Sequence, residues 1–187
     1  MAKYAMFIDP NRCTGCHACR VACQMQWSLQ PETFYNRLEQ YEAGKYPNLT
    51  RTILPVQCQH CDNPPCQQVC PTGATYKRDD GIVLIDPDKC IGCKYCMVAC
   101  PYNARMLNEH GVAEKCRFCA EYVVQGETPA CVSTCMNQVR IFGDLEDPAS
   151  PIHAALANQE VEQLLSKFNT SPRIFYAKTK KVGREVE

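Results

Sequence analysis

Sixteen cysteines occur in four groups of four, and two of these groups repeat one spacing. The repeated pattern is C-x2-C-x2-C-x3-C, at Cys13, Cys16, Cys19 and Cys23 and again at Cys90, Cys93, Cys96 and Cys100. The other two groups are Cys58, Cys61, Cys66 and Cys70, and Cys116, Cys119, Cys131 and Cys135. Thiolates at such spacings are the ligands of cubane [4Fe–4S] clusters, in which each iron takes one cysteine sulfur. The pattern therefore predicts four clusters and a chain that carries electrons.

Two other uses of cysteine compete with this interpretation, a disulfide framework and zinc sites. Against disulfides, residues 1–9 (MAKYAMFID) lack the features of a secretory signal peptide. The cysteines also crowd into triplets three residues apart, which suits a grip on one compact inorganic core. Zinc ribbons use two C-x2-C pairs rather than this longer run. We therefore favour iron–sulfur clusters, whose assembly needs the reduced thiols of the cytoplasm.

The composition excludes several other classes of function. Twenty basic and twenty acidic residues cancel, although four oxidised clusters with their thiolates would add about −8. No apolar run approaches the roughly 18 residues of a membrane span, so we predict no direct span and no nucleic-acid partner. The dinucleotide, P-loop and serine-hydrolase motifs are absent from the sequence. We predict no catalytic residue and interpret the chain as a non-enzymatic carrier.

The cysteine groups belong to a longer duplication. Residues 8–23 (IDPNRCTGCHACRVAC) and 85–100 (IDPDKCIGCKYCMVAC) match at ten of sixteen positions. The other two groups also resemble each other, because proline lies shortly before Cys66 and Cys131, and each continues x3-C. The chain is therefore a duplicated module.

The stretch between Cys70 and Cys90 predicts a β-hairpin, with strands at residues 74–78 and 82–86 and a turn at 79–81. With its flanking cysteine groups, and with proline after Cys70 and Cys100, it resembles a bacterial two-cluster ferredoxin. That resemblance implies that the fourth cysteine of each run ligates the other cluster. The implied inner sites are Cys58, Cys61 and Cys66 with Cys100, and Cys90, Cys93 and Cys96 with Cys70.

The outer groups are flanked by two further strand candidates, residues 4–8 and 139–145. We expect these to pair across the chain, which nests the inner module inside a second, permuted ferredoxin-like module. The outer sites would then be Cys13, Cys16 and Cys19 with Cys135, and Cys116, Cys119 and Cys131 with Cys23. The alternative layout pairs the first group with the second and the third with the fourth, and it leaves these strands without a role.

The predicted fold class is therefore α+β, with two nested ferredoxin-like modules, a loop insertion and a C-terminal helix. The outer module takes residues 1–25 and 108–147, the insertion 26–52, the inner module 53–107, and the helix and tail 148–187. Ser150 is expected to cap a helix that begins with Pro151. Its apolar stripe would be Ile152, Leu156, Val161, Leu164, Leu165 and Phe168. Residues 173–178 suit a late strand, and residues 178–187 a mobile tail.

Other residues near the cysteines receive more ordinary interpretations. The aromatic residues of the insertion, Trp27, Phe34 and Tyr35, are expected to pack locally. Because sixteen thiols suffice for four clusters, His17 and His60 are interpreted as outer-sphere or surface residues. Gly15 and Gly92 fall in loops where backbone N–H groups approach sulfide. The cations beside the ligands are interpreted singly as solvated surface charges: Arg20, Lys94, Lys115 and Arg117.

The order of the groups, the wide fourth group and the length resemble the four-cluster iron–sulfur subunit of the molybdopterin oxidoreductase (dimethyl sulfoxide reductase) family. The resemblance covers residues 4–145. The stretch CQHCDNPPCQQVCPTGATY at residues 58–76 is most similar to the subunit of polysulfide or thiosulfate reductase. Met136 departs from the cluster motif, which often has proline after its last cysteine.

This resemblance implies a molybdopterin catalytic subunit and an integral membrane subunit that oxidises quinol, in anaerobic respiration. Electrons would enter at the site of Cys90 and leave at the site of Cys13. The chain is expected to be peripheral on the inner membrane, at the periplasmic face after co-export with a signal-bearing partner. A free polyferredoxin, or the equivalent subunit of a formate dehydrogenase or hydrogenase complex, are the alternatives.

The number of metal sites predicts that folding depends on iron. A chain this small and rich in loops has little apolar core of its own, so metal binding supplies folding free energy. Complete removal of iron should leave a largely disordered chain when measured by circular dichroism. A native-like spectrum of the iron-free protein would refute this.

Overall fold

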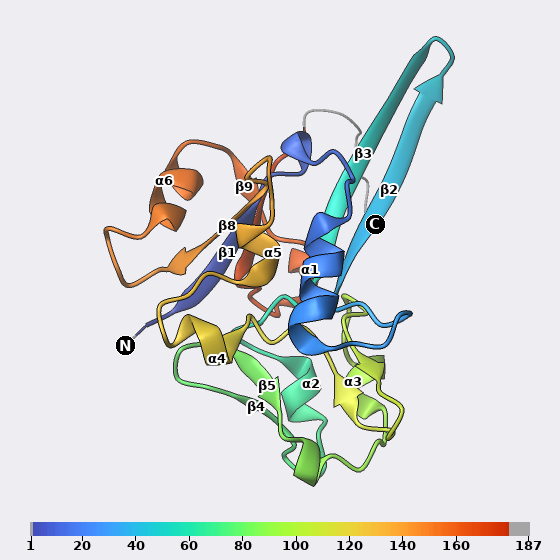
Figure 1. Ribbon diagram of the computed structural model, residues 1–187, viewed down its shortest axis with the longest axis vertical. Coiled ribbons are helices and arrows are strands. Elements are labelled where there is room, and N and C mark those ends of the chain that lie inside the picture. Colours follow the sequence, from blue (N-terminus) through green and yellow to red (C-terminus); the bar gives the residue numbers. More distant parts are fainter. Residues whose placement is uncertain (1, 180–187) are drawn as a thin grey trace.

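The computed structural model describes residues 2–179, which form a four-stranded sheet, three two-stranded hairpins and short helices packed around the cysteines. The sheet has the strand order β8-β1-β10-β9, built from β8 (Arg140–Asp144), β1 (Tyr4–Ile8), β10 (Ile174–Ala177) and β9 (Val161–Glu162). It lies in one half of the molecule, and the hairpin of β4 (Thr75–Lys77) and β5 (Val83–Ile85) lies in the other (Figure 1).

Strand β1 is the central element of the sheet because both of its faces are apolar. It pairs antiparallel with β8, from Tyr4 opposite Asp144 to Ile8 opposite Arg140, and parallel with β10. Side chains alternate along a strand, so Ala5 and Phe7 face one side and Met6 and Ile8 the other. The first pair packs against α6 (Pro151–Ala157), and the second joins the core that contacts the cysteines. The expected pairing of residues 4–8 with residues 139–145 is confirmed.

The hairpin expected between Cys70 and Cys90 is also present. Strands β4 and β5 pair from Thr75 opposite Ile85 to Lys77 opposite Val83. The remaining helices are α1 (Ala18–Trp27), α2 (Pro65–Gln68), α3 (Tyr95–Val98), α4 (Ala120–Val123) and α5 (Ala130–Ser133). Short 3-10 turns occur at η1 (Pro10–Arg12), η2 (Pro87–Lys89) and η3 (Ser166–Phe168). A fourth ladder, β6 (Met106–Leu107) with β7 (Ala113–Glu114), was not expected from the sequence.

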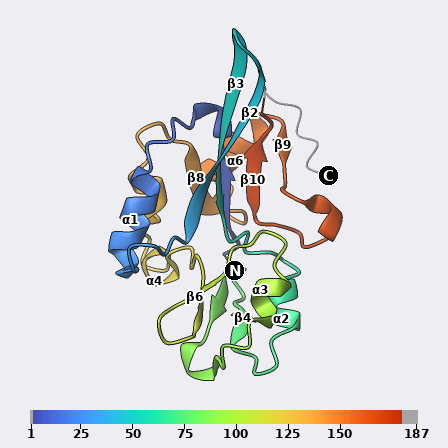
Figure 2. The same ribbon diagram turned by 90° about the vertical axis from the view of Figure 1, so that its right-hand side faces the viewer.

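The insertion forms a long hairpin that projects from the molecule (Figures 1 and 2). Its strands are β2 (Asn36–Lys45) and β3 (Asn48–Gln57), so β3 extends beyond residue 52 toward Cys58. The aromatic residues pack locally, as expected. Trp27 meets Tyr122 edge to face with ring centroids 5.8 Å apart, and Arg20 lies over Phe34 at 3.6 Å. Tyr35 is buried, and its hydroxyl donates to Glu114 over 3.0 Å.

The C-terminal segment differs from the predicted long helix. Helix α6 starts at Pro151 as expected but ends at Ala157, and only Ile152 and Leu156 of the proposed stripe lie on it. Val161 instead joins β9, where it pairs with Ala177, because an open edge of β10 gains backbone hydrogen bonds there. Ser150 occupies the N-cap position without capping the helix; its Oγ accepts from the Asp144 N–H at 3.0 Å.

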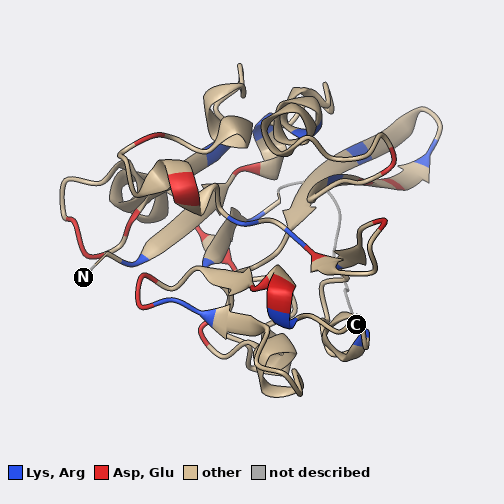
Figure 3. Cartoon of the chain, turned by 60° about the horizontal axis from the view of Figure 1, so that its bottom comes forward, with Lys and Arg blue, Asp and Glu red and all other residues tan. Residues whose placement is uncertain are grey.

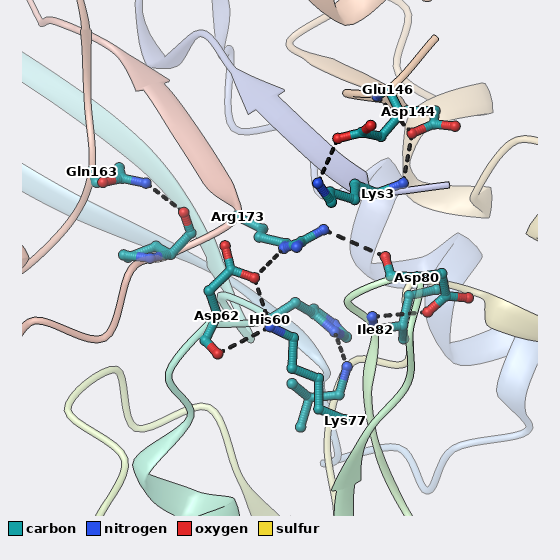
Figure 4. A network of polar contacts seen from close by, with 12 residues as sticks. Lys3, His60, Asp62, Lys77, Asp80, Ile82, Asp144, Glu146, Gln163 and Arg173 are labelled. Atoms are coloured by element: carbon teal, nitrogen blue, oxygen red, sulfur yellow. Dashed lines mark hydrogen bonds and ion pairs between the residues drawn. The ribbon is translucent and has the colours of Figure 1, made fainter. Parts of the chain in front are cut away.

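The strand expected at residues 173–178 is confirmed as β10, and it ties the sheet to the other half of the molecule. Arg173 Nε donates to Asp62 Oδ1 at 2.7 Å, and Lys77 Nζ lies 2.6 Å from the same oxygen (Figure 4). Arg173 also donates to the Asp80 carbonyl at 3.4 Å. The mobile tail expected at residues 178–187 falls almost wholly outside the described residues.

The close contact of α6 with β8 depends on the absence of a side chain at Gly143. A Cβ atom there would collide with Ser150 Oγ and would lie 3.0 Å from Ile152 Cγ2. Gly143→Val should therefore cost about 1–3 kcal/mol through overpacking. The midpoint temperature for thermal loss of the visible cluster absorbance should fall by several degrees, at about 2–4 °C per kcal/mol.

A matched control is Ala43→Val on the projecting hairpin, which adds volume outside this contact. If both substitutions lower the midpoint temperature equally, the packing of α6 on Gly143 does not limit stability.

Candidate metal centres

The fold gathers cysteines from distant segments into shared cavities. Three of the cavities are lined by four cysteines each. The Cys13 site is lined by Cys13, Cys16, Cys19 and Cys135. The Cys23 site is lined by Cys23, Cys116, Cys119 and Cys131. The Cys70 site is lined by Cys70, Cys90, Cys93 and Cys96. In each case one cysteine comes from a different sequence group than the other three.

The remaining four cysteines form what we call the Cys58 site. Cys58, Cys61 and Cys100 pack together with Tyr102 and Ala104. Burial raises the pKa of Cys61 to about 12, and the neighbouring thiols of Cys58, Cys66 and Cys100 raise it further. Cys66 faces the next site, because it packs with Cys96 and Val83.

The four sites follow one another in a row. Cys131 of the Cys23 site packs in the same apolar cluster as Cys13, Cys19 and Cys135. Cys116 of the Cys23 site in turn packs against Cys58 and Cys61. Cys66 and Cys96 then join the Cys58 site to the Cys70 site. The two middle sites hold mostly buried thiols, whereas Cys16 is exposed and Cys70, Cys90 and Cys93 are half-buried.

The duplicated sequence builds the same loop twice. Asp9 Oδ1 accepts from the N–H of Asn11 at 3.0 Å, and Asp86 Oδ1 accepts from the N–H of Asp88 at 3.1 Å. These bonds start the turns η1 and η2, which deliver Cys13 and Cys90. Gly15 and Gly92 then adopt positive φ values of 74° and 66°, which glycine tolerates without strain. The chain can therefore curl its backbone around the thiols in both copies.

Backbone N–H groups point at four of the sulfurs. The donors and acceptors are Thr75 to Cys70 at 3.4 Å, Ala113 to Cys90 at 3.4 Å, Phe118 to Cys116 at 3.5 Å and Val139 to Cys135 at 3.3 Å. Burial opposes ionisation of Cys70, but the Thr75 N–H and the Thr72 hydroxyl lower the pKa of this thiol overall. Hydrogen bonds of this kind also tune the reduction potential of an iron–sulfur cluster.

The donor set fits iron–sulfur chemistry. All sixteen cysteines are free thiols, and sulfur is the donor that these cavities have in common. Burial raises the pKa of Cys23 to about 12, that of Cys131 to about 11, and that of Cys116 well above its ordinary value. Such thiols hold their protons at neutral pH until a metal replaces them. A bound [4Fe–4S] cluster supplies reversible one-electron chemistry.

The two histidines beside ligands have different environments. His17 lines the Cys13 site, and its Nδ1 lies 3.2 Å from an Arg20 guanidinium nitrogen. His60 is fully buried, stacks on Phe118 at 3.8 Å, and accepts at Nδ1 from the Val83 N–H at 3.1 Å. Burial lowers the pKa of His60 well below its ordinary value, and nearby Lys115 and Arg105 lower it further. His60 is therefore a neutral packing residue.

Three basic residues occupy positions that the sequence pattern did not indicate. Lys115 is 2% exposed, so the interpretation of this residue as a solvated surface charge is wrong. Arg105 and Arg140, which carried no sequence signal, are 4% and 2% exposed. Lys94, by contrast, is exposed as expected. Elsewhere, charged residues of both signs are spread over the chain (Figure 3).

Two family models of the 4Fe-4S dicluster domain match residues 12–74 and 49–145. An iron–sulfur component of the polysulfide reductase of Wolinella succinogenes is 39% identical, over 98% of both chains. The chain belongs to the four-cluster iron–sulfur subunits of the molybdopterin oxidoreductase family. The corresponding subunit of the sulfite dehydrogenase of Allochromatium vinosum is 38% identical over all of this chain and 88% of its own. That of the tetrathionate reductase of Salmonella typhimurium is 42% identical, over 93% and 72%.

Family membership establishes the general function. The chain is a non-catalytic electron-transfer subunit of a multi-subunit reductase and carries four [4Fe–4S] clusters on its sixteen cysteines. No helix among residues 2–179 has both the length and the apolar character needed to cross a bilayer.

Proposed function

We propose that this subunit relays electrons between an integral membrane subunit that oxidises quinol and a molybdopterin catalytic subunit, as part of a reductase of the polysulfide or thiosulfate type. The observation that carries the proposal is the row of four cysteine sites with its most exposed thiols at the two ends. A relay needs shielded centres in the middle and accessible centres where electrons enter and leave.

We further propose the ligand sets. Each cavity holds one cluster on its own four thiols, so the ligands are those that define the Cys13, Cys23, Cys58 and Cys70 sites. Cys135, Cys23, Cys100 and Cys70 then each cross from one sequence group to complete another site. Nested modules follow, with the outer pair on residues 1–25 and 108–147 and the inner pair on residues 53–107. The pairing of β1 with β8 supports this layout.

Each terminal site is accompanied by exposed apolar side chains, which supports a docking role. Near the Cys70 site, Ile91 is 67% exposed and Val98 is 87% exposed. Beside the Cys13 site, Met136 is 91% exposed. Proline at that position would remove this side chain, so the departure from the usual motif gives the Cys13 end an apolar contact. We assign the Cys70 end to the membrane subunit and the Cys13 end to the catalytic subunit.

The assembled complex would lie on the inner membrane, at the periplasmic face after co-export with a signal-bearing partner. The support for this location is the resemblance to complexes of that kind, together with the need for a partner that supplies the membrane attachment.

The ligand sets can be tested by counting iron in paired substitutions. Cys23→Ser with Cys119→Ser removes two ligands from one proposed site, so anaerobically prepared protein should keep about twelve of about sixteen irons. Cys23→Ser with Cys16→Ser damages two proposed sites and should leave fewer, down to about eight. Iron analysis and electron paramagnetic resonance (EPR) of the reduced protein give the readout.

The sequential layout places Cys16 and Cys23 in the same sequence group and predicts the reverse order of iron loss. Equal loss in both double variants would also contradict the crossed ligands.

The partners can be tested by affinity purification of the native protein from detergent-treated membranes. It should recover a large molybdenum-containing subunit and an integral membrane subunit, on the periplasmic side of spheroplasts. Val98→Glu should release the membrane subunit and keep the molybdenum, whereas Met136→Glu should do the reverse, because each puts a charge into one apolar contact.

Each of these variants is the control for the other, and both should retain the iron content of the unchanged protein. Purification of the unchanged chain alone, in stable form, would instead indicate a free polyferredoxin.

A further inference from the structure

Three basic side chains are buried among the cysteine sites without an acidic partner. Arg105, Lys115 and Arg140 are each at least 96% buried. None of the ion pairs among residues 2–179 includes any of them. One guanidinium nitrogen of Arg105 and one of Arg140 lack any hydrogen-bond acceptor in this part of the chain. A buried unpaired charge is costly, so each cation needs a negative group that the protein side chains do not provide.

Arg140 lies between the Cys13 site and the Cys23 site. Its side chain lines the cavity of the Cys13 site, and one guanidinium nitrogen donates to Gln57 Oε1. Gln57 in turn lines the cavity of the Cys23 site. Burial raises the pKa of Cys13 and of Cys131, and the positive charge of Arg140 opposes the rise in both sites. Arg140 is therefore electrostatically coupled to both outer sites.

Arg105 has the equivalent position in the inner pair. Its guanidinium donates to Thr75 Oγ1 at 3.1 Å, and Thr75 lines the Cys70 site. The preceding residue, Ala104, packs with Cys58 and Cys61 of the Cys58 site. Burial alone would lower the pKa of Arg105, but the nearby thiols, including Cys66 and Cys96, raise it overall. These two cysteines belong to different sites.

Lys115 lies at the remaining junction, between the two middle sites. Its Nζ donates to the carbonyl of Cys116 at 2.8 Å, which belongs to the Cys23 site. It also donates to the carbonyl of Val83, a residue packed against Cys66 of the Cys58 site. The row of sites therefore alternates with Arg140, Lys115 and Arg105, with one cation at each junction.

We propose that Arg140, Lys115 and Arg105 are electrostatic positioning residues that raise the reduction potentials of the two clusters on either side of each. This inference rests on the proposed ligand sets. An oxidised cluster with four thiolates carries about −2, and reduction adds one electron without breaking a bond. A fixed cation shared by two sites attracts that added charge, and it attracts it strongly because the interior screens it less than water does. The clusters in turn supply the counter-charge that the buried cations lack.

The test is an EPR-monitored redox titration of the complete, iron-loaded protein. Arg140→Gln, Lys115→Met and Arg105→Gln should each lower the midpoint potentials of two clusters and leave the other two unchanged. The expected shift is at least a tenfold change in the reduction equilibrium, or about 59 mV for one electron. Arg140→Lys, Lys115→Arg and Arg105→Lys should keep potentials close to those of the unchanged protein, because they keep the charge.

The pattern of shifts identifies the junctions without prior assignment of the four signals. The Arg140 and Lys115 variants should share one shifted midpoint, and so should the Lys115 and Arg105 variants, whereas the Arg140 and Arg105 variants should share none. Matched controls are Arg12→Gln and Lys94→Gln, which remove exposed cations next to Cys13 and Cys93. Both should leave all four midpoints in place, because water screens exposed charges.

Iron content separates this inference from the proposal on which it rests. Unchanged midpoints in neutral variants with about sixteen irons would overturn the inference and leave the ligand sets intact. Fewer irons in the unchanged protein would count against the ligand sets instead. If a neutral variant fails to assemble, its charge-conserving counterpart decides: assembly of that variant supports the need for charge, and failure of both assigns the residue a role in shape alone.

Discussion

The gathering of thiols from distant segments into shared cavities is the constraint on which this structure depends. Cys135 lies with Cys13, Cys16 and Cys19, and Cys23 lies with Cys116, Cys119 and Cys131. A site built in this way exists only when both ends of the chain are in place, which explains why β1 must pair with β8 and why cluster binding and folding are coupled. The helices around the sites are short because their task is to present sulfur rather than to build a core.

The same constraint explains the distribution of charge. Sixteen thiolates and four clusters concentrate negative charge along one row, although the sequence as a whole is neutral. The exposed Lys and Arg residues face water and are screened by it, whereas Arg105, Lys115 and Arg140 lie inside the protein. Cations inside the protein interact with the clusters through a medium of low polarizability, so a few of them outweigh many on the surface.

The projecting hairpin and the exposed apolar residues indicate that the chain is built for contact with other proteins. Strands β2 and β3 extend beyond the body of the molecule, and Tyr46 near their tip is 89% exposed (Figure 2). Apolar residues at both ends of the cysteine row are similarly open to solvent. A carrier that works inside a larger reductase needs such surfaces, because electrons must pass to partners held close to its terminal sites.

The sequence alone determined the chemistry, because cluster ligation needs particular spacings of one residue type, and those spacings are local. It also predicted the strand pairs at both modules, since apolar runs such as residues 4–8 can only be buried strands. It did not predict where α6 ends, because the apolar spacing that continues past Ala157 suits a helix and only the open edge of β10 favours a strand at Val161. It held no sign that Arg105 and Arg140 are buried, since burial depends on which segments close around a side chain. The tertiary structure decided those features, and with them which charges act on the clusters.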